Sequence, residues 1–548
     1  MRTGGELLVA CLQEQGVSTS FGVPGESYLA VLDALYDSSI DFVICRQEGG
    51  VGYATSAWGK LTGEPGIGFV TRGPGATNVS VGLHAAMQES SPAVIFIGQA
   101  SMGHLGREAF QEVDYRAFFG PLVKWVTQIE HVDRIPEIIS RAFSTALSGR
   151  RGPVVVALPE DVLTATTSVP PGQKVRVPVP APTPQIIDEV ATELANAERP
   201  LLLVGGGGWG ADDRELLRNF AESNSIPVVT VFRFNDLIDN GSACYLGDAG
   251  VAMRPHVREA LAQADLVLAV GGRFGEVATD GFTLFDMPDA LQKIVHVHTS
   301  DRELGKVLQA DIPVHSAPGP FLEMLRSVQI PRDDAKVNWF TRWSGRHAES
   351  LIAPTQPGPM DMSEVMVWLQ KRLPGDVIIT NGAGNFSAWP NKHFSYGQDA
   401  RLLAPQSGSM GYGLPAAIAA KVKYRERMVV CFAGDGDIQM NIQELGTAMQ
   451  AKAQPIIVVL NNGMYGTIRM HQERDFPSRV SGTQIVNPDY VQLAQAYGFH
   501  AERIERTQDF APAFDRAASS ESGGLLEVIV PAEMLTPAIS IEQMRNRL

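Results

Sequence analysis

Short apolar runs alternate with helical patterns along the 548-residue chain. In the first third, an apolar run at 41–45 precedes a helical pattern that begins near Glu48, and the run at 66–70 leads into a Gly-Pro-Gly turn and a second helix. The same alternation continues through apolar runs at 92–98, 200–208, 227–231, 264–272, 293–298, 376–380, 427–434, 455–462 and 525–530. Strands that alternate with helices predict parallel sheets covered on both faces.

Two stretches that are rich in Pro, Gly and polar residues predict linkers, one at 164–184 and one at about 331–362. A chain of this length is also too long for a single hydrophobic core. We therefore expect an α/β fold of three doubly wound parallel-sheet domains, over residues 1–163, 185–330 and 362–535.

The first and third predicted domains contain one segment each with a weakly similar sequence pattern. Residues 71–98 and 433–461 both carry a glycine turn, a helix with Ala-Met-Gln near its end, a proline and an apolar strand. Common ancestry of the two domains would explain the match, and so would the general sequence pattern that unrelated strand–helix–strand units share. The sequence leaves these two explanations open.

Charge and cysteine usage limit the classes of function. With 45 Lys and Arg against 60 Asp and Glu, the net charge of −15 disfavours nucleic acid and anionic membrane as partners. The four cysteines are scattered singly, without metal-ligand spacing or a disulfide framework, which is typical of a reducing compartment. The first residues lack the apolar run of a signal peptide, and no stretch reaches transmembrane length. We expect a soluble, cytoplasmic protein.

The segment 428–462 carries the most informative chemistry. An apolar strand runs into Gly434-Asp435-Gly436-Asp437, a helical pattern follows, and a second apolar strand ends in Asn461-Asn462. A strand–helix–strand crossover places both strand ends at the same edge of a parallel sheet, so Asp435 and Asn462 are expected to lie close together. Taken alone, the glycine turn is an ordinary tight turn and the Asn pair an ordinary strand end.

Together, these two oxygen-bearing residues predict a magnesium–diphosphate site. One carboxylate and one amide oxygen suit Mg²⁺, which keeps few protein ligands and completes its shell with water and phosphate. Gly434 and Gly436 allow close approach of the backbone, and the N-terminus of the following helix favours an anion at the same place.

The chain as a whole resembles the thiamine-diphosphate-dependent enzymes, and within them the acetohydroxyacid (acetolactate) synthases. The segments that carry the resemblance occur in the family's order: FGVPGES, RQEGG, RGPGATN, AFQE, GSMGYGLPAA and GDGD followed by LNN. The resemblance implies that Asp435, Asn462 and the carbonyl of Met464 hold Mg²⁺, and that Met410 is the apolar wedge that bends the cofactor. It places the rest of the third domain's cofactor contacts at Gly384, Asn385, Gly408, Gly434, Gly436, Asp437 and Tyr465.

The resemblance also implies a role for Glu48. A carboxyl group hydrogen-bonded to the aminopyrimidine ring favours the tautomer that takes the C2 proton of the thiazolium ring. Without the resemblance, Glu48 is an ordinary acid at a helix start. Further residues would line the reaction space, namely Gly25, Phe110, Gln111 and Lys124. Gln47 stands where many relatives carry histidine.

The implied reaction is decarboxylation of a 2-oxo acid such as pyruvate, followed by carboligation to a second carbonyl, in branched-chain amino acid biosynthesis. Two departures from the family pattern argue against the family's usual pair of substrates: Val277 replaces an arginine that binds the acceptor carboxylate in the family, and His471 replaces a tryptophan. A 2-oxo acid decarboxylase and a 2-hydroxyacyl-CoA lyase or oxalyl-CoA decarboxylase are the competing activities. The family's sites form between subunits, which implies a homodimer or homotetramer.

The middle domain leaves its ligand open. A glycine run with Gly205 and Gly206 follows a strand, and Arg273 matches a flavin-contacting position of the family. His298, however, stands where the family carries an acidic flavin contact. FAD, another adenine nucleotide and an empty pocket remain the three possibilities. Taken alone, the glycine run also fits a nucleotide-dependent oxidoreductase, a different class of enzyme.

Overall fold

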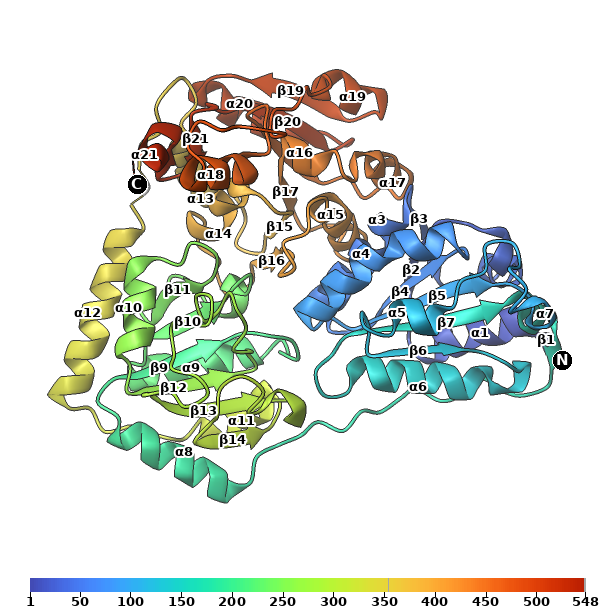
Figure 1. Cartoon of the computed structure of the whole chain (residues 1–548), viewed down its shortest axis with the longest axis horizontal. Helices are drawn as coiled ribbons and strands as arrows, with labels where there is room; N and C mark the ends of the chain where they lie inside the picture. The colour runs from blue at the N-terminus through green and yellow to red at the C-terminus, as the bar shows by residue number, and fades with distance from the viewer. Residues whose placement is uncertain (353, 547–548) are drawn as a thin grey trace.

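The computed structural model describes residues 1–352 and 354–546, and it contains three six-stranded sheets, one for each predicted domain. In Figure 1 the N-terminal domain lies at the right in blue, the central domain at the lower left in green, and the C-terminal domain at the top in orange and red. Every strand pair within these three sheets is parallel. The predicted α/β class with three parallel-sheet domains is confirmed.

The N-terminal sheet has the order β3-β2-β4-β5-β7-β6. Its strands are β2 (Thr19–Gly22), β3 (Asp41–Ile44), β4 (Gly66–Val70), β5 (Ala93–Gln99), β6 (Trp125–Gln128) and β7 (Pro153–Pro159). The helices are α1 (Gly4–Glu14), α2 (Leu29–Tyr36), α3 (Glu48–Thr62), α4 (Pro74–Glu89), α5 (Tyr115–Phe119), α6 (Ile135–Leu147) and α7 (Glu160–Thr164). Alternate residues of β5 enter two separate cores, with Phe96 facing α1 and α6, and Ile95 facing α3 and α4. The sheet is therefore buried on both faces, as its continuous apolar strands predict.

The C-terminal sheet has the order β16-β15-β17-β18-β20-β19. Its strands are β15 (Ile378–Asn381), β16 (Arg401–Leu403), β17 (Val429–Gly434), β18 (Ile456–Asn461), β19 (His500–Ile504) and β20 (Gly524–Ile529). The helices are α13 (Met362–Arg372), α14 (Ala388–Lys392), α15 (Gly413–Lys423), α16 (Asp435–Ile438), α17 (Leu445–Gln450), α18 (Gly466–Asp475), α19 (Tyr490–Ala496), α20 (Thr507–Ser519) and α21 (Ile541–Arg545).

The first and third domains share one topology. Numbered within its own domain, each sheet has the strand order 2-1-3-4-6-5. The Gly-Pro-Gly turn after β4 and the Gly-Asp-Gly turn after β17 follow the third strand of their respective sheets. The similar segments 71–98 and 433–461 therefore occupy equivalent positions in the two domains, which favours duplication of one ancestral unit over a chance match.

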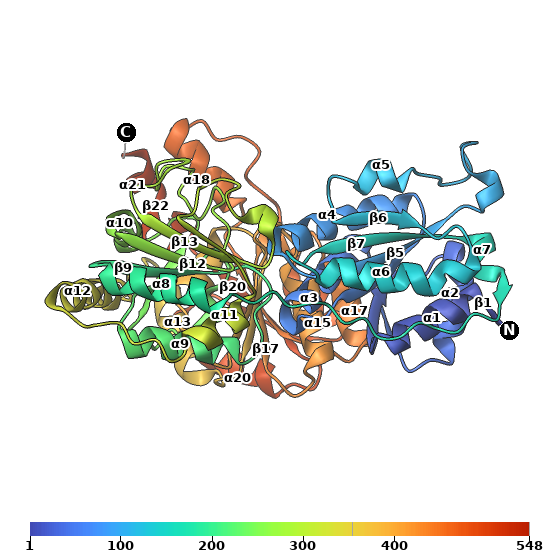
Figure 2. The same cartoon turned by 90° about the horizontal axis from the view of Figure 1, so that it is seen from below.

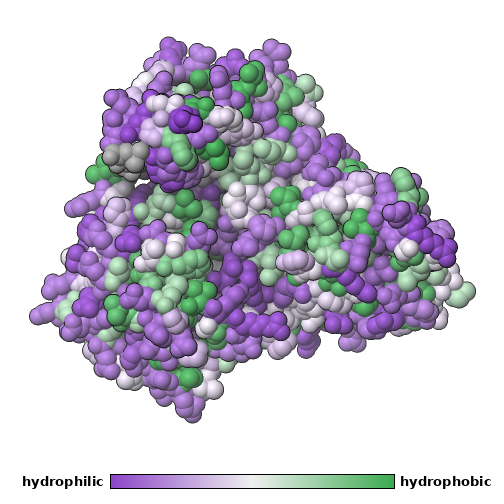
Figure 3. Space-filling model, in the orientation of Figure 1, coloured by the Kyte–Doolittle hydropathy of each residue, from purple (hydrophilic) through white to green (hydrophobic). Residues whose placement is uncertain are grey.

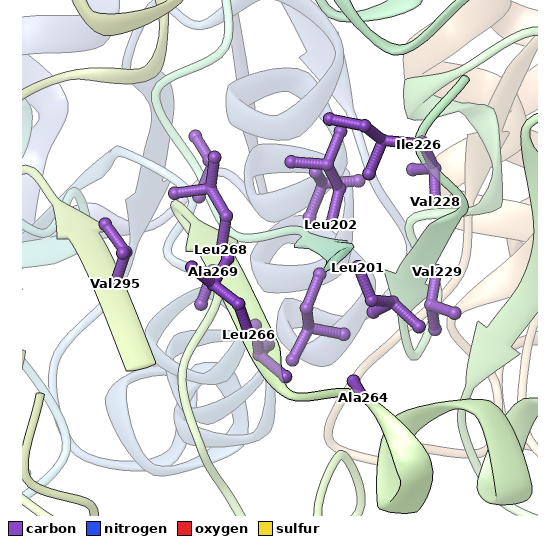
Figure 4. Close-up of a cluster of buried hydrophobic side chains, with 14 of the residues drawn as sticks. Leu201, Leu202, Ile226, Val228, Val229, Ala264, Leu266, Leu268, Ala269 and Val295 are labelled. Atoms are coloured by element: carbon purple, nitrogen blue, oxygen red, sulfur yellow. The ribbon is translucent and has the colours of Figure 1, made fainter. Parts of the chain in front are cut away.

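The central sheet has the order β11-β10-β9-β12-β13-β14, which is the arrangement of a dinucleotide-binding fold. Its strands are β9 (Pro200–Val204), β10 (Val228–Val231), β11 (Tyr245–Ala249), β12 (Leu266–Val270), β13 (Lys293–His298) and β14 (Ile312–His315), and its helices include α8 (Pro184–Asn196), α9 (Asp213–Asn224), α10 (Pro255–Gln263) and α11 (Pro318–Leu325). Figure 4 shows part of its core, with Leu201, Leu202 and Leu268 projecting from the faces of the paired strands β9 and β12.

The second predicted linker is wrong for most of its length. Residues Asp334–Ser350 form helix α12, whose Trp339 and Trp343 are buried in the core of the central domain. The polar residues of this stretch mark the outer face of an amphipathic helix rather than a flexible connection. Residue 353 of the predicted linker lies outside the described residues.

The N-terminal and C-terminal domains contact each other within the chain. Helices α3 and α15 lie side by side at this junction, and Val51 and Ala54 of α3 share one core with Leu414 and Ile418 of α15 (Figure 2). On the face drawn in Figure 3, hydrophilic residues are interspersed with small hydrophobic patches. None of the helices over the described residues has the length and apolar character needed to cross a membrane.

Candidate active site

The two predicted metal-binding side chains come from neighbouring parallel strands. β17 ends at Gly434 and β18 ends at Asn461, and their register pairs Gly434 with Leu460. Asp435 and Asn462 therefore follow the carboxyl ends of adjacent strands, and both side chains line one cavity. The structure thus has the juxtaposition that the crossover predicts.

The carboxylate of Asp435 is buried and is held by two donors. Its Oδ2 accepts hydrogen bonds from the Asn487 side-chain amide at 2.7 Å and from the backbone N–H of Gly463 at 2.9 Å. Burial raises the pKa of Asp435, while these donors act in the opposite direction. Asn487 also donates to Oδ1 of Asn461 at 2.9 Å, so it ties the two strand ends together.

Sequence reasoning missed Asn487 entirely. It lies in a loop well after the second strand, and a lone asparagine in a loop carries no signal of its own. Only the tertiary fold brings its amide to Asp435.

The cavity around this pair has a volume of about 250 Å³ and collects every third-domain residue that the resemblance singles out. These residues are Gly384, Asn385, Gly408, Met410, Gly434, Asp435, Gly436, Asp437, Asn462, Met464 and Tyr465. Its wall also includes the segment Met534–Pro537 near the end of the chain. The cavity therefore combines a polar end at the strand termini with an apolar side around Met410.

The Asp437 carboxylate, which the resemblance places at the diphosphate, is hydrogen-bonded to backbone groups of the cavity wall. Its Oδ1 accepts the N–H groups of Gly411 at 2.9 Å and Ala383 at 3.1 Å. Burial raises the pKa of Asp437 to about 7. The carboxyl group ties together two loops that form the cavity wall, those that contain Gly384 and Met410.

Glu48 is the first residue of α3, at the carboxyl edge of the N-terminal sheet. Its Oε2 accepts a hydrogen bond from the side-chain amide of Asn78 at 2.9 Å. Gln47 caps the helix, with its Oε1 accepting N–H groups of Gly49 at 2.5 Å and Gly50 at 3.3 Å. The residue that replaces the histidine of many relatives thus holds the helix start on which Glu48 sits.

Three of the residues predicted to line the reaction space lie beside the turn 71–75 after β4, namely Gly25, Phe110 and Gln111. A Cβ atom on Gly25 would lie 2.5 Å from Cβ of Thr71, and one on Gly73 would lie 2.8 Å from Cβ of Gln111. The Phe110 ring is 71% exposed beside the same turn, so this apolar ring is available to a ligand or a second chain. A Cβ atom on Gly75 of this turn would lie 3.1 Å from Oε1 of Glu48, so the turn brings these residues near Glu48. We call Glu48, Gly25, Phe110 and Gln111 the Glu48 cluster.

Lys124 does not belong to this cluster. It precedes β6, and its backbone N–H donates to the carbonyl of Pro153 at the start of β7, which places it at the amino edge of the sheet. Its ammonium group donates to the carbonyls of Thr145 and Ser148 at the end of α6. Lys124 caps a helix at the edge opposite Glu48, so we remove it from the proposed reaction space.

A buried glutamate joins the two cofactor domains. Glu444 of the C-terminal domain is 1% exposed, and its Oε1 accepts the backbone N–H groups of Arg46 at 3.1 Å and Gln47 at 3.0 Å. Burial raises the pKa of Glu444. No local pattern singles this residue out, because the N–H groups it binds lie almost 400 residues away.

The central residues predicted to hold a flavin do not fit one. The cavity beside the turn Gly206–Gly208 has a volume of about 60 Å³, far below the roughly 300–1,000 Å³ of ordinary ligand pockets. Trp209 folds over the turn, and its indole N–H donates to the carbonyl of Gly205 at 2.9 Å. Arg273 is turned into the protein and donates to the carbonyl of Gln88 at 2.6 Å. The cavity beside this turn is therefore too small to hold a flavin, and Arg273 is engaged with Gln88 instead.

Comparison with known proteins agrees with the geometry. Three family profiles match in order: thiamine pyrophosphate enzyme, N-terminal TPP binding domain, over residues 2–118; central domain over 187–325; and C-terminal TPP binding domain over 382–528. Acetolactate synthase isozyme 2 large subunit of Escherichia coli is 31% identical over 100% of both chains. The acetolactate synthase large subunit of Parasynechococcus marenigrum is 33% identical over 92% of this chain and 83% of its own.

A eukaryotic relative shows the same extent of similarity. The mitochondrial acetolactate synthase catalytic subunit of Saccharomyces cerevisiae is 31% identical over 96% of this chain and 80% of its own. These findings do not favour a nucleotide-dependent oxidoreductase, a simple 2-oxo acid decarboxylase or an acyl-CoA lyase. The chain belongs to the thiamine pyrophosphate enzymes and is an enzyme of the acetolactate synthase-like type.

Proposed function

We propose that this enzyme decarboxylates pyruvate or a similar 2-oxo acid and joins the remaining fragment to a second 2-oxo acid, as in acetolactate synthesis. The observation that carries the proposal is the pairing of Asp435 and Asn462 at the ends of β17 and β18, in one cavity with Met410. Full-length similarity to acetolactate synthases supports the choice of reaction.

The cavity fits Mg²⁺ and thiamine diphosphate. The hydrogen bonds from Asn487 and Gly463 to Asp435 both use Oδ2, which leaves Oδ1 for a cation. The Asn462 amide oxygen and the Met464 carbonyl would be further hard oxygen ligands in the same cavity. A bound cation would also offset the cost of burying the Asp435 charge. When bound, thiamine diphosphate supplies the electron sink that decarboxylation requires.

The remaining steps fall to side chains of the chain itself. Met410 lines the cavity and would support the cofactor there, and Glu48 would hold a proton against its pyrimidine ring. Gln111 and Phe110 would exclude water from the reacting carbonyl and orient it, and Gly25 leaves room for its approach. The resemblance to the family suggests these roles, and the grouping of the residues in the Glu48 cluster and in the cavity around Asp435 and Asn462, which we call the diphosphate cavity, supports them.

The two halves of the site lie on different surfaces of one chain. Every described residue lining the diphosphate cavity falls within 356–537, and Glu48 is not among them. Large apolar side chains are exposed on both sides, including Tyr36 and Phe110 in the N-terminal domain and Ile468 and Phe476 in the C-terminal domain. We infer that a second copy brings its Glu48 cluster to this cavity, in a homodimer or a homotetramer built from such dimers.

Two residues bear on the choice of the acceptor substrate. Val277 offers no charge to bind an acceptor carboxylate, and His471 lies exposed on α18. The test is to incubate the purified enzyme with pyruvate, thiamine diphosphate and Mg²⁺ and to separate acetolactate from acetaldehyde. Acetolactate supports the proposal, whereas CO₂ with acetaldehyde alone would assign a decarboxylase. Absence of turnover across a panel of small 2-oxo acids would refute both.

A further inference from the structure

A small polar cavity lies where the three domains meet, away from the diphosphate cavity. It has a volume of about 60 Å³. Its wall takes Lys60 and Arg151 from the N-terminal domain, the turn Gly206–Gly208 and Arg214 from the central domain, and Arg401 from the C-terminal domain. Four cationic side chains around one small space are unusual in a chain whose net charge is −15.

The Arg214 side chain is 15% exposed, but two of its guanidinium nitrogens are buried and make no hydrogen bond. Its Nε and Nη1 atoms have no partner among the described residues, and its nearest carboxylate oxygen, Oδ2 of Asp236, lies 3.7 Å from Nη2. Arg151 uses one of its donors, from Nη1 to the carbonyl of Gly63 at 3.1 Å. A buried cation without hydrogen-bond partners is costly, so these free N–H groups indicate a missing acceptor.

The glycine turn adds backbone donors to the same wall. The N–H groups of Gly206, Gly207 and Gly208 have no acceptor within the described parts of the chain. Gly206 and Gly208 have φ of +74° and +97°, in the region that favours glycine. Successive N–H groups in such a turn form a concavity that binds anions.

Two acidic side chains share the cavity wall. Asp236 forms a long ion pair with Arg214, at 3.7 Å, but neither Asp236 nor Glu89 accepts a hydrogen bond from it among the described residues. Asp236 is drawn to the C-terminal domain, where its Oδ2 accepts the N–H of Leu402 at 3.2 Å. Burial raises the pKa of Glu89, and its Oε1 has no partner among the described residues.

We propose that this junction cavity binds one phosphate-sized oxyanion, held by Arg214, Arg151 and the N–H groups of Gly206–Gly208. A space of this volume holds about four to six water molecules, which matches the five heavy atoms of phosphate and excludes a dinucleotide. The anion contacts the N-terminal and central domains, which meet only in the folded chain, so its binding stabilises their arrangement by mass action.

The test uses the full-length enzyme dialysed free of phosphate. Inorganic phosphate is added at constant ionic strength, thermal unfolding is followed by calorimetry, and bound phosphate is counted by equilibrium dialysis. We expect a saturable rise in Tm with one phosphate per chain. Arg214→Gln should weaken phosphate binding by about tenfold or more, because it removes a charge-assisted contact.

Arg218→Gln is the matched control, since Arg218 lies one helical turn further along α9 and outside the cavity wall. It should bind phosphate like the wild type. Arg151→Gln provides a second cavity variant should Arg214→Gln fail to fold. Equal binding by wild type and both cavity variants, or the absence of phosphate binding, overturns the proposal.

A parallel titration with AMP distinguishes free phosphate from the phosphate group of a nucleotide. Tighter binding of AMP than of phosphate, lost in Arg214→Gln, would assign a nucleotide to the site and overturn the single-oxyanion proposal. Sulfate in place of phosphate should bind as well, because the donors recognise oxygen atoms and charge rather than phosphorus.

Discussion

Asn487 donates a 2.7 Å hydrogen bond to the Asp435 carboxylate and a 2.9 Å bond to Asn461. One side chain from a distant loop therefore sets the orientation of the proposed metal ligand and fixes the ends of both strands. Partners of this kind commonly matter to metal affinity almost as much as the ligands themselves.

Asn487→Ala should weaken Mg²⁺ binding by about 10–100-fold while thiamine diphosphate still binds at saturating Mg²⁺. The reason is that Asp435 would lose a donor that holds its carboxylate in place. Isothermal titration of Mg²⁺ in the presence of the cofactor measures the change. Asn219→Ala, on the exposed face of α9, is the control; unaltered Mg²⁺ affinity in Asn487→Ala would argue against its positioning role.

Glu48→Gln should leave cofactor affinity within a few-fold of the wild type and slow exchange of the C2 proton by about 10²–10⁴-fold. A neutral amide keeps the shape of the carboxyl group but cannot exchange a proton with the ring. Hydrogen–deuterium exchange at C2, followed by NMR, measures the rate. Glu14→Gln, at the end of α1, serves as a control, and unchanged exchange would remove Glu48 from its proposed role.

Two inactive variants should complement each other if the site forms between chains. Glu48→Gln and Asp435→Ala are each expected to be inactive alone. Co-expressed or refolded together, they form mixed dimers in which one of two sites carries both wild-type residues, giving about a quarter of wild-type activity. Activity that stays at the level of the single variants, although mixed dimers are isolated by differential tags, would contradict the shared site.

Glu473 should anchor the C-terminal segment near the cavity. Its side chain is fully buried, and it accepts hydrogen bonds from Arg469 and Arg545, each at 2.7 Å. These partners, chiefly Arg545, lower the pKa of Glu473 from 4.5 to about 2. Because the folded-state pKa is depressed, the stabilisation is present above about pH 4.5 and is lost as the pH falls towards 2.

Glu473→Gln should therefore remove this part of the acid sensitivity and release α21 at neutral pH. The segment Met534–Pro537 lines the diphosphate cavity, so cofactor affinity should fall as well. Limited proteolysis of the C-terminus and unfolding measured from pH 6 to 2 test both effects. Glu521→Gln, in the loop before β20, is the comparison, and the same acid dependence in wild type and Glu473→Gln would disprove the anchor.

Lys124→Met should keep kcat and lower Tm. Its ammonium group binds carbonyls at the end of α6, so its loss removes a helix cap but leaves the Glu48 cluster intact. Burial lowers the pKa of Lys124 to about 8. Since its unfolded value is near 10.5, wild-type stability should rise relative to Lys124→Met between about pH 8 and 10. A large loss of kcat in a folded variant would return Lys124 to the reaction space.

The sequence by itself determined the three-domain α/β fold, since apolar runs without polar interruption can be satisfied only between two helical layers. It also determined the meeting of Asp435 and Asn462, because one short crossover leaves a single handedness and a shared sheet edge. Both depend on contacts close along the chain. The predictions for Lys124 and for the linker at 331–362 were wrong for one reason: a local sequence pattern does not show which remote residues a segment packs against.

Tertiary structure alone decided the rest. It brought Asn487 to Asp435 and Glu444 to the start of α3. It also placed Lys124 at the edge of the N-terminal sheet opposite Glu48, and it packed the polar stretch 334–350 onto the core of the central domain as a helix. It also packed Trp209 across the glycine turn that the sequence offered as a flavin cradle. In each case the partner is remote in sequence, and the free energy of packing or hydrogen bonding with that partner overrides the local preference.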